Sequence, residues 1–291
     1  AALHPAILDG LHRYVRDRQP LLEELAANRA TPDETVAKIA RFCDVRTAER
    51  IATNEERLLV FPTIIEALYL NKSTRMSTAD RLVELAARNG VELTGVATFA
   101  AHVQAIQGQL IIDEPIDAPL PSDILFDEAL EADNDEDAIE QDKVDGTEEV
   151  KASHRPLAFR IGEMSVAEKI RLSLIGNAAA RAILSRDSNK LVSMAAVTSP
   201  AMRDGEAARM AMSKQVSEDI LRYIGNRRDW LGNYEVKRNL VFNPKTPMGI
   251  SMNFLSHLRA TDLRTLARSK NVPASLRSAA KQRVQKQQRK G

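Results

Sequence analysis

The chain has 291 residues, of which 44% are hydrophobic and 28% are charged, as in a globular protein that buries a core. No apolar run approaches the ~20 residues of a membrane span. A single cysteine, Cys43, excludes an intrachain disulfide and a cysteine-based zinc cage. We therefore expect a cytoplasmic protein with no membrane span, no metal site and no cofactor.

The net charge of +1 hides a strong segregation along the chain. Residues 1–112 hold 14 acidic and 13 basic residues, and residues 113–149 hold 16 acidic residues and one basic residue. Residues 150–291 hold 10 acidic and 27 basic residues, a net charge of +17. A near-neutral part is thus followed by an acidic part and then by a strongly basic one.

The stretch AANRATPDET, residues 26–35, predicts that one helix ends and the next begins. Asn28 tolerates the left-handed conformation that often ends a helix. Thr31 is expected to cap the next helix, with Pro32 in its first turn and Glu34 completing a capping box. Stretches of similar spacing recur as LNKSTRMS, AMSKQVSEDI, LVFNPKTPMG and ARSKNVPASL. Helices joined by such short polar turns form antiparallel hairpins.

The segments between these turns have the apolar spacing of short amphipathic helices. Examples are ETVAKIARFC, ADRLVELAARNG, AEKIRLSLIGN and EDILRYIGNR. Ser165 followed by Glu168 predicts a capping box at the start of one of them. Cys43 falls on the apolar side of its helix, which favours a buried thiol over a reactive one. The sequence therefore predicts an all-α protein.

Residues 112–156 are rich in Asp, Glu and Pro and cannot bury enough apolar surface to offset the entropy of ordering them. We expect a disordered acidic linker here, between a helical module at 1–111 and a basic helical module at 157–291. Within the linker, Ile124, Leu125 and Phe126 follow a capping serine and are candidates for folding onto a partner groove. The alternative is an apolar accident in a tether.

The stretch GNRRDWLGNYEVKR in the basic module combines cations with aromatic side chains. Such clusters occur at protein interaction hot spots and on single-stranded nucleic acid. The alternative is that the aromatic rings fill a groove between helices while the arginines are solvated. The candidate partner-binding residues are Arg227, Arg228, Trp230, Tyr234, Lys237 and Arg238.

The helices with N-x-x-T-P turns resemble HEAT-like and leucine-rich-repeat-variant helical proteins of bacteria, over roughly residues 20–95 and 165–285. The resemblance implies an all-helical, α-solenoid-like scaffold, in each module, that binds macromolecules, and it carries over no catalytic residue. The sequence also holds no Gly-rich phosphate loop, no helical His pair and no nucleophile-elbow motif. We therefore expect a non-enzymatic scaffold or adaptor that binds protein partners. The alternative is a nucleic-acid-associated protein whose basic module meets a polyanion and whose acidic linker modulates that contact.

Overall fold

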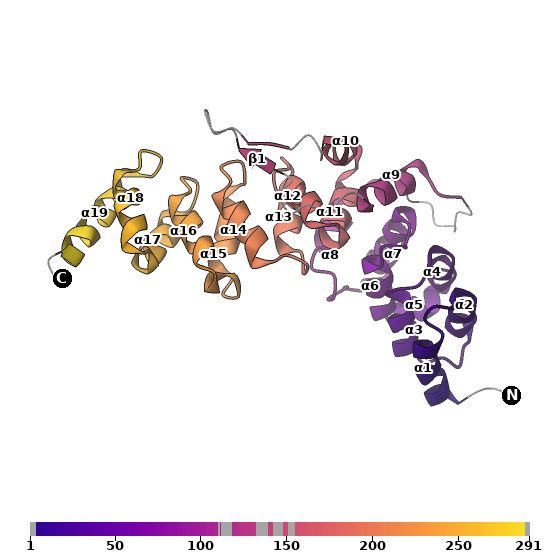
Figure 1. The fold of residues 1–291 in the computed structure, drawn as a ribbon. Helices are drawn as coiled ribbons and strands as arrows, with labels where there is room; N and C mark the ends of the chain where they lie inside the picture. Colours follow the sequence, from indigo (N-terminus) through magenta and orange to yellow (C-terminus); the bar gives the residue numbers. More distant parts are fainter. Residues whose placement is uncertain are drawn as a thin grey trace. The chain divides into compact units, whose positions relative to one another are not determined.

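The computed structural model describes residues 4–109, 111, 118–131, 139–141, 148–150 and 155–288. Its internal contacts divide the chain into two compact units. Unit 1 comprises Ala1–Ala132 and Phe159–Asn177, and unit 2 comprises Asp133–Ala158 and Ala178–Gly291. The described part of the chain is helical apart from two strands of three residues each, which confirms the all-α prediction (Figure 1).

Unit 1 is built from short helices that pack on their neighbours in sequence and on the second helix along, as α1 does on α2 and α3. Its helices are α1 (Pro5–Tyr14), α2 (Gln19–Ala27), α3 (Asp33–Ala40), α4 (Val45–Ala52), α5 (Glu55–Val60), α6 (Thr63–Leu70), α7 (Met76–Arg88), α8 (Phe99–Ile106), α9 (Pro121–Leu130) and α11 (Val166–Ile175). The division between the units falls within α10 (Arg155–Glu163).

Unit 2 contains a run of helical hairpins, each packed on the next (Figure 1). Contacts join α12 to α14, α13 to α15, α14 to α16 and α17 to α19. Its elements are β1 (Ile139–Gln141), β2 (Glu148–Val150), α12 (Ala178–Leu184), α13 (Lys190–Thr198), α14 (Asp204–Met212), α15 (Glu218–Asn226), the 3-10 turn η2 (Trp230–Gly232), α16 (Tyr234–Phe242), α17 (Met248–Phe254), the 3-10 turn η3 (Leu255–His257), α18 (Ala260–Arg268) and α19 (Ala274–Gln288).

One turn geometry recurs in both units, and we call each instance a corner. A corner starts at the Asn or Ser that follows one helix and ends where the next helix begins, as from Asn28 to Asp33 and from Asn243 to Met248. In five corners, the side-chain oxygen of the first residue accepts a hydrogen bond from the backbone N–H two residues later. These first residues are Asn28, Asn71, Ser213, Asn243 and Ser269.

The corners correct two predictions about local chemistry. Asn28 has an extended backbone, with φ −71° and ψ 122°, and no described non-glycine residue has a positive φ. The predicted left-handed helix end is therefore wrong. Thr31 is not a helix cap either, because α3 begins at Asp33 after Pro32. Its hydroxyl donates instead to the carbonyl of Leu25, 2.6 Å away, at the end of the preceding helix. By contrast, the capping box of Ser165 and Glu168 is confirmed.

The predicted disordered linker at 112–156 is wrong where it meets α9. This helix packs on α7 and α11, and Phe126 is fully buried. Both carboxylate oxygens of Asp123 accept hydrogen bonds from Ser77, one from its backbone N–H at 2.8 Å and the other from its hydroxyl at 3.0 Å. Further along, Ile139 pairs with Val150 in an antiparallel ribbon of β1 and β2. The rest of the predicted linker lies mostly outside the described residues.

The predicted start of the second module at residue 157 also differs from the observed division. Phe159–Asn177 belong to unit 1, because α11 packs on α8 and α9. Residues 133–158, which are assigned to unit 2, therefore separate the two parts of unit 1 along the chain. The reason is that α9 and α11 pack on helices that precede the acidic segment, α9 on α7 and α11 on α8.

Candidate functional site

A helix end leaves backbone carbonyls without a partner inside the helix, and at three corners a side chain from a later hairpin binds them. In unit 2 the side-chain amide of Asn243 donates to the carbonyls of Ala211 and Ser213, at 2.9 and 2.7 Å. Lys245 adds a contact from Nζ to the carbonyl of Val216 at 3.4 Å. Asn243 is buried, so these bonds replace water at the end of α14. The corner asparagine thus ties its own hairpin to the preceding one.

Asn71 makes the equivalent contact in unit 1. Its amide nitrogen donates to the carbonyls of Ala40 and Cys43, at 2.9 and 3.0 Å, across 31 and 28 residues of sequence. Its side-chain oxygen meanwhile accepts from the N–H of Ser73 at 2.9 Å. One carboxamide therefore satisfies its own turn and the end of α3. An aspartate or a serine offers no donor with this reach.

The corner at Asn71 is in turn bound by Arg171, which lies 100 residues later on α11. Its guanidinium donates to the carbonyls of Tyr69, Asn71 and Thr74, at 3.1, 2.9 and 2.8 Å. Its charged carbon also lies 5.0 Å from the centre of the Phe126 ring. Arg171 is fully buried, and this burial lowers its pKa. Among the described residues no carboxylate hydrogen-bonds to this cation, and three carbonyl dipoles and the aromatic face stabilise it.

Arg57 binds the corner at Asn28 in the same way. Its guanidinium donates to the carbonyls of Ala26 and Thr31, which occupy the same positions in their corner as Tyr69 and Thr74 in theirs. Arg57 also pairs with Asp33, with Nε 2.6 Å from Oδ1. Two arginines far apart in the sequence therefore bind equivalent carbonyls at equivalent corners. Nothing in the local sequence of either arginine predicts this contact.

A buried Tyr–His–Asp chain lies on α6, α7 and α8. The Tyr69 hydroxyl is 2.7 Å from Nδ1 of His102, and Nε2 of His102 is 2.7 Å from Asp80. Both rings are fully buried, and burial raises the pKa of Tyr69 above its usual value. A substrate cannot reach the tyrosine oxygen or the imidazole in this arrangement. The chain of hydrogen bonds therefore serves to join the three helices.

The predicted site on α9 is split between surface and core. Ile124 is half-exposed, whereas Phe126 faces inward beneath the Arg171 guanidinium and Leu125 is partly buried. Phe126 is therefore unavailable to a partner groove, contrary to the prediction for that residue. Its burial follows from the packing of α9 on α7 and α11, which the composition of the surrounding segment conceals.

The predicted site in unit 2 is also divided. Trp230 packs in the hydrophobic core with its ring under the Arg227 guanidinium, 5.7 Å from the ring centre. Arg227 and Arg228 are exposed, and Lys237 is partly buried. The structure thus places Trp230 in the groove between helices that the alternative interpretation described.

Two further predicted residues of this cluster are engaged in a network with α18. Tyr234 donates its hydroxyl to Asp262 and accepts from the N–H of Arg259 at 3.0 Å, while the Arg259 guanidinium covers the tyrosine ring. Arg238 pairs with the other oxygen of Asp262, at 3.1 Å. Burial and the hydrogen bond to Asp262 raise the pKa of Tyr234. These side chains join consecutive hairpins, which leaves mainly Arg228 and Lys237 for contact with a partner.

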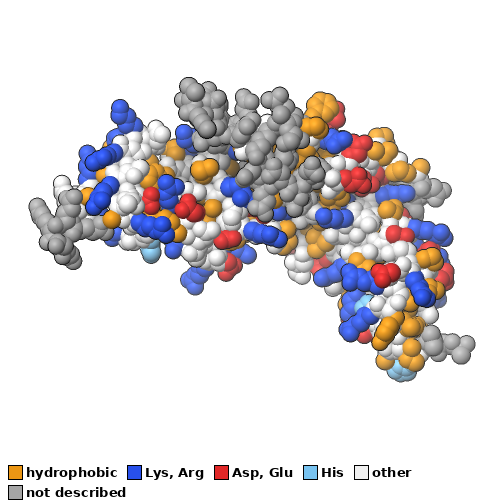
Figure 2. Space-filling view, in the orientation of Figure 1, with side chains coloured by type: hydrophobic (Ala, Val, Ile, Leu, Met, Phe, Trp, Pro, Cys, Tyr) orange, Lys and Arg blue, Asp and Glu red, His pale blue; other side chains and the backbone are white. Residues whose placement is uncertain are grey.

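Figure 2 shows Lys and Arg side chains outnumbering Asp and Glu over the visible face of α14 to α19. Part of this basic surface comes from the corners, because four corners of unit 2 carry a cation one or two residues after their first residue. These cations are Arg186, Lys214, Lys245 and Lys270.

Cys43 is fully buried, which confirms the expected buried thiol. Burial raises its pKa to about 12, so the thiolate is disfavoured at neutral pH. In the described part of the chain, no group of three or more His, Cys, Asp or Glu side chains is placed to hold a metal ion. No described helix combines the length and the apolar character needed to cross a membrane.

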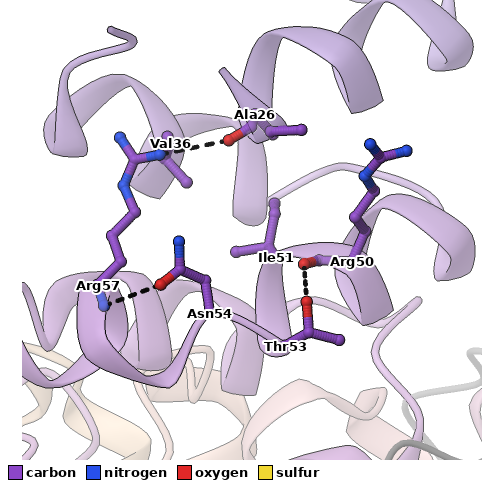
Figure 3. A pocket seen from close by; sticks show the side chains of 8 residues that line it. Ala26, Val36, Arg50, Ile51, Thr53, Asn54 and Arg57 are labelled. Carbon is purple, nitrogen blue, oxygen red and sulfur yellow. Dashed lines mark hydrogen bonds between the residues drawn. The ribbon is translucent and has the colours of Figure 1, made fainter. Parts of the chain in front are cut away.

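A pocket of about 160 Å³ opens on unit 1 where α2, α3, α4 and α5 meet (Figure 3). Ala26, Ala27, Val36 and Ile51 provide its apolar lining, and Arg50, Thr53, Asn54 and Arg57 provide its polar lining. Figure 3 shows Ile51 between the side chains of the two arginines, with Asn54 beside Arg57. The lining comes from segments spread over more than 30 residues, and no local motif in the sequence announces it.

The comparisons with known proteins leave the family open. No protein-family model matches the sequence, and no curated protein and no solved structure is significantly similar to it.

Proposed function

We propose that the chain is a non-enzymatic helical-repeat scaffold, with two α-solenoid-like, HEAT-like modules that bind other proteins along their exposed helical surfaces. The observation that carries this proposal is the recurrence of one corner device. Asn71, Asn243, Arg57 and Arg171 each bind backbone carbonyls at the end of a helix in another hairpin. Stacking of similar units through nearest-neighbour contacts is the construction of repeat proteins, whose extended surfaces bind macromolecules.

The polar side chains with the most distinctive chemistry support a scaffold. His102, Tyr69 and Arg171 are buried and saturated with internal partners. Their bonds hold helices together and leave outer faces to contact a partner. In unit 2 those faces include Arg228 and the partly buried Lys237.

The proposal is tested by capturing partners on the tagged full chain, with and without nuclease, and mapping contacts by cross-linking. Partners retained after nuclease and cross-linked to exposed residues of the hairpins support a protein scaffold. Arg228→Glu should weaken the capture of a partner that contacts unit 2. Arg222→Glu is the matched control, because Arg222 is exposed but lies outside the predicted cluster and pairs with Glu218. Equal loss in both variants would contradict a specific role for Arg228.

The charge of residues 150–291, +17, favours nucleic acid as a second candidate partner. Cations repeated at the corners would bind phosphates without selecting a base sequence. The acidic residues between 112 and 156 would then compete for the same surface. Affinity for a single-stranded oligonucleotide should fall steeply as salt rises. Complete loss of captured partners on nuclease treatment would favour this function over the protein scaffold.

A further inference from the structure

The pocket between α2, α3, α4 and α5 presents hydrogen-bond donors above an apolar floor. The side-chain oxygen of Asn54 already accepts from the N–H of Arg57 at 3.2 Å, whereas its side-chain nitrogen donates to no described residue. Arg50 uses Nη1 on Glu23, at 2.8 Å, and its Nε and Nη2 have no hydrogen-bond partner among the described residues. The carbonyl of Ala26 already accepts from Arg57. A ligand with acceptors therefore matches this rim better than one with donors.

The charges around the pocket favour an anionic acceptor. Glu23 is buried and is shared by two guanidinium groups, those of Arg46 at 3.1 Å and Arg50 at 2.8 Å. A second acid, Glu24, is largely exposed and lies 3.9 Å from Arg50. Arg57 is balanced by Asp33. Glu23 and Glu24 thus offset the charges of Arg46 and Arg50. The pocket itself is lined by two cations, Arg50 and Arg57, and by no described acidic side chain, so its lining favours an anion.

The size of the pocket limits the ligand to a small group. The volume of about 160 Å³ is close to that of a cavity of ~150 Å³ that holds one benzene ring. The apolar lining, mainly Val36 and Ile51, suits a branched aliphatic or small aromatic group. A large cofactor or a nucleotide does not fit a space of this size.

We propose that this pocket binds a carboxylate that carries a short apolar group. The carboxylate contacts Arg50 and Asn54, and the apolar group lies on Val36 and Ile51. Two sources offer this chemistry: a free short-chain acid, and the C-terminal residue of a peptide. Only the second source rests on the proposed scaffold function, for which it would specify part of the partner.

The test is a titration of the full chain with isovalerate, followed by NMR of the pocket residues. Contacts of this number predict a dissociation constant on the order of 1 mM. Asn54→Asp keeps the oxygen that caps α5 but replaces the free donor by a second carboxylate oxygen, and it should weaken binding at least tenfold. Isovaleramide, which has the same apolar group without the charge, should bind at least tenfold more weakly than isovalerate.

Arg50→Gln and Arg46→Gln form a matched pair. Each removes one guanidinium from Glu23, but only Arg50 lines the pocket. Arg50→Gln should weaken binding at least tenfold, whereas Arg46→Gln should change it less than about threefold. Equal losses would overturn the proposal, because they would show a general charge effect. Absence of saturable shifts in the pocket, or equal binding of the amide, would also overturn it.

N-acetylvaline distinguishes the two sources. If N-acetylvaline binds more tightly than isovalerate, the site is assigned to a peptide C-terminus. If N-acetylvaline binds more weakly, the site is assigned to a free acid. Either result retains the carboxylate site. The outcome is separable from that of the scaffold function, since captured partners are identified without reference to this pocket. If the Arg50→Gln variant still captures the same partners, the scaffold function stands whatever the titration shows. The titration alone decides whether the pocket binds a carboxylate.

Discussion

Replacing Asn243 by serine separates the two roles of a corner asparagine. Serine at this position preserves the local turn, because Ser213 and Ser269 accept the same hydrogen bond from the N–H two residues later. It lacks the donor that reaches the carbonyls of Ala211 and Ser213, at 2.9 and 2.7 Å. The substitution therefore removes only the bonds between consecutive hairpins.

The expected cost follows from those bonds. Each contributes about 1 kcal/mol, and burial adds a penalty for carbonyls left without a donor, so Asn243→Ser should lower the unfolding free energy by about 2–3 kcal/mol. The assay is urea unfolding followed by the fluorescence of Trp230, the single tryptophan, which lies in the core of unit 2. Ser269→Ala is the control, because it removes one exposed turn bond and should cost about 0.5 kcal/mol.

The two explanations of the corner motif differ in what they predict here. If the asparagine only ended its own helix, Asn243→Ser would retain the stability of the parent chain. A loss below about 0.5 kcal/mol would therefore refute the account in which the corner ties adjacent hairpins together.

Three further predictions concern unit 1. Arg171→Met should lower the unfolding free energy by at least about 3 kcal/mol in a urea titration followed by circular dichroism, because three corner carbonyls lose their donor; unchanged stability would show that water replaces it. Because burial raises the pKa of Cys43 to about 12, the thiol should react with a disulfide reagent at pH 8 far more slowly in the native chain than in urea, and equal rates would place it at the surface. The pKa of Asp9 is lowered to about 2, first by the hydrogen bond from Thr35 and then by Lys38. Its stabilising effect should be complete above the unfolded pKa near ~4 and be lost as the pH falls towards 2. An NMR titration gives the value, Thr35→Val should raise it, and an ordinary pKa for Asp9 would contradict the observed contacts.

Much of the fold could be predicted because its signals are local. Apolar spacing identified the helices, and the pair Ser165 and Glu168 identified a helix start that the structure confirms. The recurrence of corners was also visible in the sequence. Their mechanism was not, because the Asn71 amide binds carbonyls 28 and 31 residues away, and no local pattern encodes that distance.

Long-range contacts explain the remaining errors. Phe126 lies in a segment whose composition predicts disorder, yet Arg171 and the packing of α9 on α7 bury it. The pocket residues were missed because Val36, Arg50 and Asn54 converge only after three helices have packed. Arg57 and Arg171 carry no sequence mark of their role, although the equivalence of their corners suggests a search for cations placed after N-x-x-T motifs.

Hydrogen exchange of the asparagine side-chain amides tests the central structural claim most directly. In a chain labelled only on asparagine, NMR can compare Asn71 and Asn243 with Asn28. The amides of Asn71 and Asn243 are buried against backbone carbonyls of another hairpin, whereas Asn28 is exposed at an equivalent corner position. The account predicts that the amides of Asn71 and Asn243 exchange at least about a hundredfold more slowly than that of Asn28. Equal exchange at all three positions would show that the corner asparagines serve only their own turns, and would contradict the account.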